Sequence, residues 1–224
     1  YYFKLPDPQR NKFNKENFTY IKQFYNSVVK FNLNCIIFHD GLSEKFLKKY
    51  TTNKIKFILF DHNNYKTTSG NDTRFLLYFD YLCEFSYDNV IISDISGIEF
   101  LCNPFISMHN KKKIYTAVSR TKDTNNKDKN MKHYWFKNYA IRVYGKYDRI
   151  APFRFQQVLA CGFFGGTYKN IKNVLLKIKD EFNYENINLK TNTNYVVYNY
   201  IMYEYFNKIM IKGYSSHNGY KETI

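Results

Sequence analysis

The sequence predicts an α/β fold, a single domain in which a mostly parallel central sheet carries helices on both faces. Three observations favour this fold. Short β-branched runs alternate along the chain with amphipathic helical patterns. Several of the runs are apolar throughout, as is typical of parallel strands buried on both faces. Three of them end in an aspartate, at Asp40, Asp61 and Asp94, where a buried strand reaches the surface.

The first half of the chain contains the clearest strand patterns. A polar turn precedes a predicted helix that Asn71 or Asp72 caps. Its apolar face comprises Phe75, Leu76, Phe79 and Leu82. In order, the predicted elements are a weak strand at 1–5, a helix at 18–31, strands at 35–40 and 54–61, the helix just described, and a strand at 89–94.

The second half contains the strongest helical pattern, at 168–182. Its apolar stripe is Tyr168, Ile171, Val174, Leu175, Ile178 and Phe182, with lysines on the opposite side. The polar segment 120–132 predicts a mobile loop, either a lid over a ligand or a surface loop. The other predicted elements are strands at 113–119 and within 155–166, and helices at 134–145 and 195–210.

The charge of the chain favours a polyanionic partner. Its 34 Lys and Arg residues against 19 Asp and Glu give a formal net charge of +15. Nucleic acid, an anionic membrane surface and phosphate-bearing small molecules all suit such a charge. The basic residues are scattered, however, and the densest run is 111–113. A solvated lysine-rich surface is therefore the plainer interpretation.

The four cysteines indicate a reducing compartment. Cys35, Cys83, Cys102 and Cys161 have apolar neighbours and no CxxC spacing, so we expect buried free thiols and a cytoplasmic protein. No apolar run approaches the roughly 18 residues of a membrane span. The sequence does not begin with methionine, and a trimmed lumenal catalytic domain is the alternative.

The aspartates at the strand ends are the first candidates for a site, because α/β proteins bind ligands at the carboxyl ends of strands. For Asp40 and Asp61 we prefer the interpretation that they are turn residues. Asp94 differs because Ser96 and Gly97 follow it. The strand would therefore present the acid at its tip, where the small residues loosen the backbone.

The block 71–105, which includes NDTRF, VIISD and NPF, resembles the nucleotide-sugar site of glycosyltransferases with the GT-A fold. In that family a helix with an Asp and an Arg near its start precedes a hydrophobic strand that ends in a DxD-type motif. Asp72, Arg74 and Asp94 match these features, whereas Ser96 and Gly97 replace the second acid. The segment 160–171 also resembles the strand and Gly-Gly turn of the family beside the sugar. The segments 7–10 and 211–220 fall where nucleotide-binding and metal-binding segments lie.

The resemblance implies a site for a nucleoside-diphosphate sugar and a divalent metal, Mn²⁺ or Mg²⁺. Asp94 and His217 would hold the metal, which neutralises the leaving diphosphate. Arg74 would either contact phosphate or orient Asp72. Because one carboxylate binds a metal weakly, a metal-independent enzyme that uses Arg and Lys is the alternative. The implied substrate-binding residues are Arg10, Asp72, Arg74, Asp94, Ser96, Gly165 and Gly166.

The implied activity is transfer of the sugar to a hydroxyl of a glycan or glycoprotein acceptor. The nucleotide-binding part would span about 1–110 and the acceptor side about 111–224 of one catalytic domain. No general base is identified, so the stereochemistry stays open. We expect no nucleic-acid partner. The alternatives are a basic nucleic-acid-binding module and a GT-A-like protein that binds sugar nucleotides without turnover.

Overall fold

The computed structural model describes residues 6–7, 12–13, 16–65, 69–106, 108, 110–119, 130–185, 187–189 and 192–214. The helices are α1 (Lys22–Lys30), α2 (Glu44–Tyr50), α3 (Gly70–Glu84), α4 (Tyr134–Tyr144), α5 (Tyr168–Phe182) and α6 (Asn194–Tyr205), with short 3₁₀ turns at Phe18–Tyr20, His62–Tyr65, Ala151–Phe153 and Asn207–Ile209 (η4). The strands are β1 (Pro6–Asp7), β2 (Lys12–Phe13), β3 (Cys35–His39), β4 (Ile55–Leu59), β5 (Asn89–Ser93), β6 (Ile114–Val118), β7 (Leu159–Thr167) and β8 (Met210–Tyr214).

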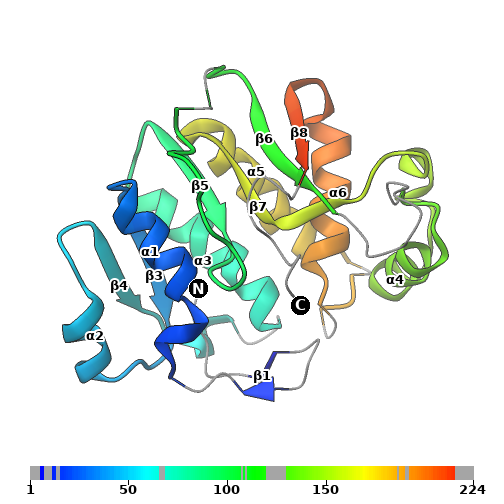
Figure 1. Cartoon of the computed structure of the whole chain (residues 1–224). Helices are drawn as coiled ribbons and strands as arrows, with labels where there is room; N and C mark the ends of the chain where they lie inside the picture. Colours follow the sequence, from blue (N-terminus) through cyan, green and yellow to red (C-terminus); the bar gives the residue numbers. More distant parts are fainter. Residues whose placement is uncertain are drawn as a thin grey trace.

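A four-stranded sheet with the order β5-β7-β6-β8 forms the centre of the fold (Figure 1). β5 and β6 both pair antiparallel with β7, whereas β6 and β8 pair parallel. Three strands therefore share one direction and β7 runs against them. β3 and β4 form a separate parallel pair, and β1 and β2 an antiparallel one. The α/β class is confirmed, but pairing within the four-stranded sheet is mixed rather than mostly parallel.

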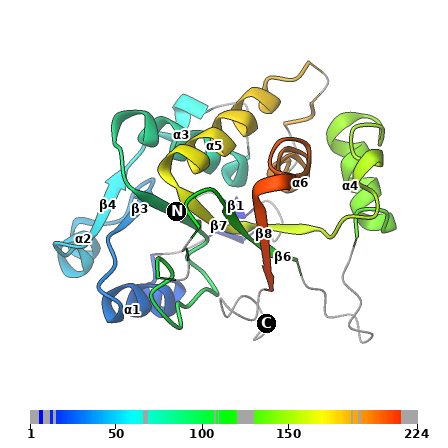
Figure 2. The same cartoon turned by 90° about the horizontal axis from the view of Figure 1, so that it is seen from above.

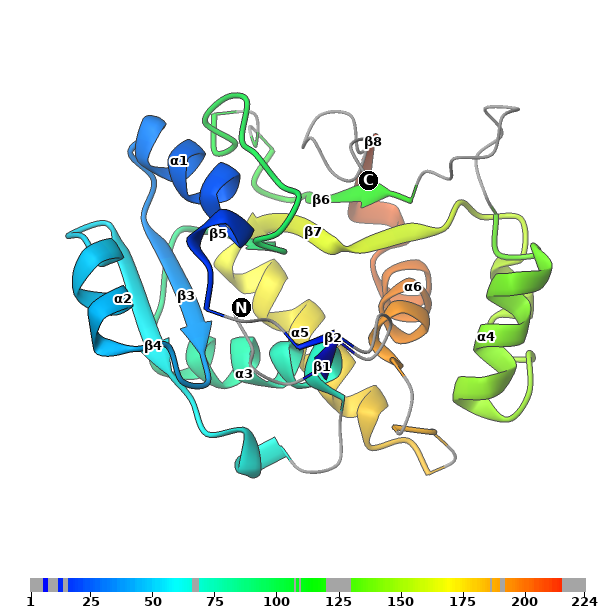
Figure 3. The same cartoon turned by 60° about the horizontal axis from the view of Figure 1, so that its bottom comes forward.

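The position of α4 explains the reversed strand. A parallel connection needs a crossover that packs over the sheet. The sequence places α4 between β6 and β7, yet α4 packs against α6 at one end of the molecule (Figure 3). The chain therefore returns as an antiparallel neighbour of β6. An alternation of strands and helices in the sequence does not reveal this direction.

Helices cover both faces of the sheet, as expected (Figure 2). α3, α5 and α6 lie on one face, and α1 lies on the other. Each face has its own hydrophobic cluster. Successive residues of a strand point to opposite faces and therefore contribute to different clusters. Ile37 of β3 and Phe163 of β7 contact the cluster that includes α1, whereas Phe38 and Phe164 belong to the cluster of α3, α5 and α6.

The predicted amphipathic helix at 168–182 is confirmed as α5. Its stripe is buried from Ile171 to Phe182, and Tyr168 packs against the same cluster. The Thr167 side chain caps its first turn by accepting the Asn170 N–H. The cap of α3 was predicted wrongly, because Ser69 precedes Gly70 and accepts the N–H of Asp72.

Other boundaries differ from the prediction. The amphipathic α2 was not predicted, and the last helix ends at Tyr205 rather than near 210, so that β8 can pair with β6. The weak strand at 1–5 and most of the loop 120–132 lie outside the described residues. The end of that loop belongs to the core: Met131 is fully buried, and Asn130 bridges to Gln157.

All four cysteines carry thiols rather than disulfide bonds, but their burial differs from the prediction. Cys161 is buried and Cys35 is half-buried, whereas Cys83 and Cys102 are exposed. Across the described part of the chain, no helix is both long enough and apolar enough to cross a membrane.

Candidate functional site

Asp94 lies immediately beyond the carboxyl end of β5. Its backbone N–H donates to the carbonyl of Gly162 in β7 at 2.8 Å, so Asp94 extends the β5–β7 ladder by one residue. The chain then bends, and Gly97 has a φ of +71°, which a residue with a side chain rarely adopts. Ser96 lies half-buried within this bend. The strand therefore presents Asp94 at its end, as the sequence predicted.

Arg74 of α3 forms an ion pair with Asp94, in which Nη1 donates to Oδ1. Arg74 lies near the start of α3, and its guanidinium reaches the end of β5. There the guanidinium also lies over the Phe75 ring, 5.0 Å from the ring centroid. Of the Arg74 side chain 12% is exposed, and of the Asp94 side chain 23%. The pair is therefore shielded on several sides yet accessible to a ligand. Of the two roles predicted for Arg74, contact with phosphate or orientation of Asp72, the ion pair with Asp94 leaves the guanidinium beside the strand end.

Gly162 makes room for the Asp94 carboxylate. A Cβ built on Gly162 would lie 2.9 Å from Asp94 Cγ and closer still to Oδ2. Glycine inside a strand often marks such a close approach. Gly162 falls within the segment 160–171 but was not predicted as a site residue. Its position in the middle of an apolar strand was the available signal.

A chain of polar contacts runs from Arg74 towards α6. Arg74 Nη2 lies 3.8 Å from the Sγ of Cys161, and that thiol donates to Asn194 Oδ1 at 3.1 Å. Asn194 Nδ2 in turn donates to Asp72 Oδ1 at 2.7 Å. Cys161 and Asn194 were not predicted as site residues. Only the polar NTN triplet before the apolar run of α6 hints at a role for Asn194.

Asp72, which was predicted to bind substrate, is completely buried and forms its hydrogen bonds within the protein. The Thr193 N–H donates to its Oδ2 at 3.1 Å, and the Asn194 N–H donates to its Oδ1 at 2.6 Å. Ser69 Oγ also donates to Oδ2, at 2.8 Å. The carboxylate thus accepts hydrogen bonds from N–H groups at the start of α6, which have no acceptor within the helix itself. A negative charge is favourable at this end of a helix. Asp72 joins the beginnings of α3 and α6.

The pKa of Asp72 is raised above its ordinary value of 3.8, because burial removes the charged form from water. The hydrogen bonds from Asn194, Ser69 and Thr193 act in the opposite direction. Tyr78 lies beside the ion pair, and burial likewise raises the pKa of its phenol. Tyr78 therefore stays protonated and neutral near Asp94 and Arg74.

Gly165 and Gly166 lie inside β7 rather than in a turn, and the fold does not bring them to Asp94. They pair with Ile91 and Val90, three and four residues before Asp94 along β5. A Cβ on Gly165 would lie 2.8 Å from Ile91 Cγ1 and closer still to Met108 Cε, and one on Gly166 would lie 3.0 Å from the Lys113 carbonyl oxygen. Close packing of β7 against its neighbouring strands and against Met108 explains both glycines without a ligand.

The remaining predicted site residues cannot be placed beside Asp94. Arg10 and His217 lie outside the described residues. Within the described ranges, no three His, Cys, Asp or Glu residues are grouped as a metal site would require. Asp61, one of the other two strand-end acids, accepts the Asn63 N–H at 2.8 Å, which confirms its predicted role in a turn.

No family model matches the chain, and no curated protein is significantly similar to it. The case for a function therefore depends on the geometry around Asp94 and on the residues themselves.

Proposed function

We propose that the protein is a glycosyltransferase that moves a sugar from a nucleoside-diphosphate sugar to a hydroxyl of a glycan or glycoprotein acceptor. The observation that carries this proposal is the partly exposed Arg74–Asp94 pair at the carboxyl end of β5. In α/β folds, ligands bind at such strand ends. The match of the block 71–105 to the GT-A pattern suggests the ligand class.

The pair offers two functions that a diphosphate donor needs. A guanidinium provides forked N–H donors that match phosphate oxygens, and Asp94 holds this guanidinium from one side. When the sugar departs, negative charge builds up on the diphosphate. A positive group that is already in place stabilises this charge without rearrangement. We therefore assign phosphate binding to Arg74 and orientation of its side chain to Asp94.

A divalent metal remains part of the proposal, as Mn²⁺ or Mg²⁺. When bound, such an ion offsets charge on the diphosphate. The described residues offer it Asp94, whose Oδ1 already accepts a hydrogen bond from Arg74. One carboxylate is a small share of the six or so oxygen ligands that these ions take. The described residues therefore fit a metal only if the diphosphate supplies most of its other ligands. Arg74 is then the positive group that the protein itself provides for the diphosphate.

Release of nucleoside diphosphate from a panel of uridine, guanosine and thymidine diphosphate sugars tests this function. We expect one base to be preferred, with release that Asp94→Asn lowers by at least about tenfold, as for a lost electrostatic contact of roughly 1.4 kcal/mol. Asp61→Asn is the matched control, because it removes a carboxylate at another strand end and leaves Arg74 untouched.

The other outcomes separate the alternatives. Nucleotide binding that depends on Asp94, without turnover of any donor, would leave a sugar-nucleotide binder rather than an enzyme. If no nucleotide binds and single-stranded nucleic acid does, the transferase proposal fails in favour of the basic nucleic-acid-binding module.

A further inference from the structure

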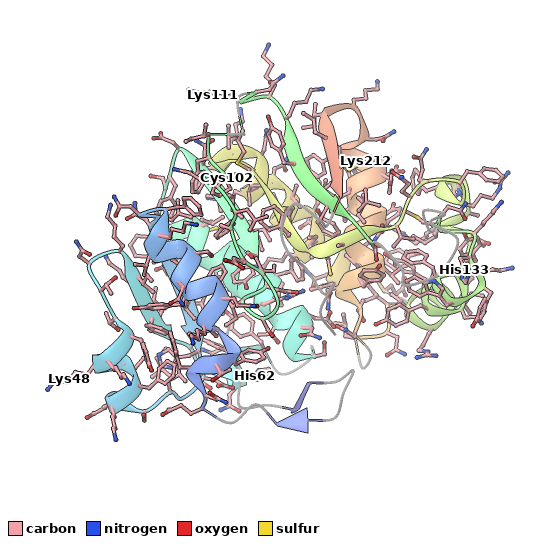
Figure 4. All side chains as sticks on the ribbon, in the orientation of Figure 1. Lys48, His62, Cys102, Lys111, His133 and Lys212 are labelled. Carbon is pink, nitrogen blue, oxygen red and sulfur yellow. The ribbon has the colours of Figure 1, made fainter. Side chains whose placement is uncertain are left out.

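The fold gathers lysines that are scattered in the sequence. Strands β5, β6 and β8 begin at the same edge of the sheet, since Ile114 is level with Gly166 and Met210. α5 begins immediately after β7 reaches this edge. Figure 4 shows Lys111 there, at the top of the view of Figure 1. We call this set of residues the basic edge: Lys111, Lys112, Lys113, Lys169, Lys172 and Lys208.

Contacts confirm that these segments adjoin. Lys113 Nζ donates to the backbone carbonyl of Lys208 at 3.2 Å, which joins the start of β6 to η4. Lys172 Nζ lies 3.3 Å from the Tyr168 hydroxyl, and that hydroxyl donates to the Leu82 carbonyl at 2.6 Å. The start of α5 therefore packs beside the end of α3, and one edge carries lysines from three segments.

Positive charge dominates this edge. The acids of the adjoining segments are Glu84, Asp88 and Glu204, and all three are exposed. The six lysines outnumber them two to one. Lys111, Lys112, Lys169 and Lys208 are exposed as well, so their charges face solvent. An anionic surface would therefore contact several of these ammonium groups at once. The run 111–113 alone would offer it fewer positive charges.

Exposed aromatic rings lie next to the lysines. Phe85 and Tyr87, between α3 and β5, are 48% and 42% exposed. Aromatic rings beside lysines are typical of protein surfaces that settle among lipid headgroups. The rings are less suited to stacking on bases. Phe85 and Tyr87 both pack against Tyr81, with centroids 4.7 and 6.4 Å away, and the two tyrosine hydroxyls are 2.9 Å apart.

We propose that the basic edge docks the protein on the anionic headgroups of a membrane surface. Each lysine near such a surface contributes attraction that falls off within a Debye length. Asp94 lies at the opposite end of β5 from this edge. A docked protein would therefore keep the Arg74–Asp94 pair open to the solution, and the proposal does not depend on what that pair binds.

Co-sedimentation with vesicles tests the docking. The chain is mixed with phosphatidylcholine vesicles, with and without phosphatidylserine, at low and high ionic strength. The test variant combines Lys111→Glu, Lys112→Glu and Lys208→Glu. The matched control combines Lys45→Glu, Lys48→Glu and Lys49→Glu in α2, which changes the net charge equally at exposed positions of another element. Melting temperatures verify that both variants fold, and Lys111→Glu alone provides a milder change.

We expect binding that requires phosphatidylserine, decreases with salt, and weakens by at least about fivefold for each edge lysine replaced by Glu, or by at least on the order of a hundredfold for three. The α2 control should bind nearly as the wild type does. Equal losses in both variants would show that net charge alone is responsible, and no preference for phosphatidylserine would overturn the docking. Tighter binding of a short single-stranded RNA that the edge variant abolishes would assign the edge to nucleic acid instead.

Discussion

Gly162 and the Asp94 carboxylate are in such close contact that a Cβ on Gly162 would lie 2.9 Å from Asp94 Cγ. The missing side chain on β7 thus leaves the space into which the acid at the end of β5 fits. Arg74 holds the same carboxylate from the side of α3. Two strands and a helix therefore determine the position of one acid, and this arrangement is open to direct tests.

Gly162→Ala should displace the Asp94 carboxylate and destabilise the protein by about 1–3 kcal/mol, as overpacking generally does. Urea unfolding measures this loss. Gly213→Ala in β8 is the control, because among the described residues its Cβ would come near the Thr116 carbonyl oxygen alone, at an ordinary 3.9 Å. Adding Asp94→Ala should restore part of the stability that Gly162→Ala removes. If the double variant instead loses the sum of the stability losses of Gly162→Ala and Asp94→Ala, the proposed clash between the two side chains is contradicted.

Arg74 and Asp94 should show a coupling free energy of about 0.5–3 kcal/mol in a double-mutant cycle of Arg74→Met and Asp94→Asn. Each single variant leaves a partly buried charged or polar group without its partner, whereas the double variant removes both. Unfolding free energies of the four proteins give the coupling. A value near zero would mean that the two residues make separate contributions and that the pair does not hold Asp94 in place.

Asp72→Asn should cost about 1–3 kcal/mol, since an amide offers one acceptor oxygen where the carboxylate offers two. The pH dependence provides a second test. Burial raises the folded-state pKa of Asp72 above the ordinary 3.8, so the folded protein holds this proton more tightly than the unfolded chain. Its contribution to stability is complete below pH 3.8 and is lost as the pH rises through the folded-state pKa.

Unfolding free energies from about pH 3 to pH 7 should therefore contain a decrease in the wild type that Asp72→Asn lacks. Asp61→Asn, at an exposed strand end, controls for loss of one carboxylate. Parallel pH profiles for the wild type and Asp72→Asn would show that Asp72 does not carry this dependence.

Arg149 should stabilise the fold without affecting the Asp94 site. Its guanidinium pairs with Glu181 at 2.8 Å and lies over the Tyr184 and Tyr200 rings, at 4.1 and 4.5 Å from their centroids. Arg149→Leu leaves Glu181 buried without its cation, and we expect a loss of about 2–4 kcal/mol in urea unfolding. Nucleotide binding should persist under conditions where the variant is folded. Its loss would place Arg149 in the functional site.

Much of the local structure could be predicted from the sequence. The stripe of α5 has helical spacing over four turns, and the β-branched runs predicted β3, β4 and β5. The reversed direction of β7 could not be predicted, because it depends on where α4 packs. The end of α6 was also missed, since Ile209 and Ile211 continue an apolar pattern that the chain uses for η4 and β8 instead.

The candidate site was predictable only where a local sequence pattern marks it. Asp94 follows an apolar strand, and this local pattern identified it. Its partner Arg74 is 20 residues away, and Asn194 is 122 residues from Asp72. Such contacts follow from the packing of helices on the sheet. The resemblance assigned Asp72 to the substrate, and nothing local in the sequence indicates that the start of α6 covers it.

The most direct test of the central claim is a melting-temperature series with uridine, guanosine and thymidine diphosphates, each with Mn²⁺ or with EDTA. Wild type, Asp94→Ala and the control Asp61→Ala are compared. A ligand at about 100 times its Kd adds about 2.7 kcal/mol, or roughly 5–10 °C for a chain of this size. We predict such a rise for one base, lost in Asp94→Ala and kept in Asp61→Ala; a rise that persists in EDTA would assign charge neutralisation to Arg74 alone. No rise with any nucleotide, or an equal rise in Asp94→Ala, would contradict the account.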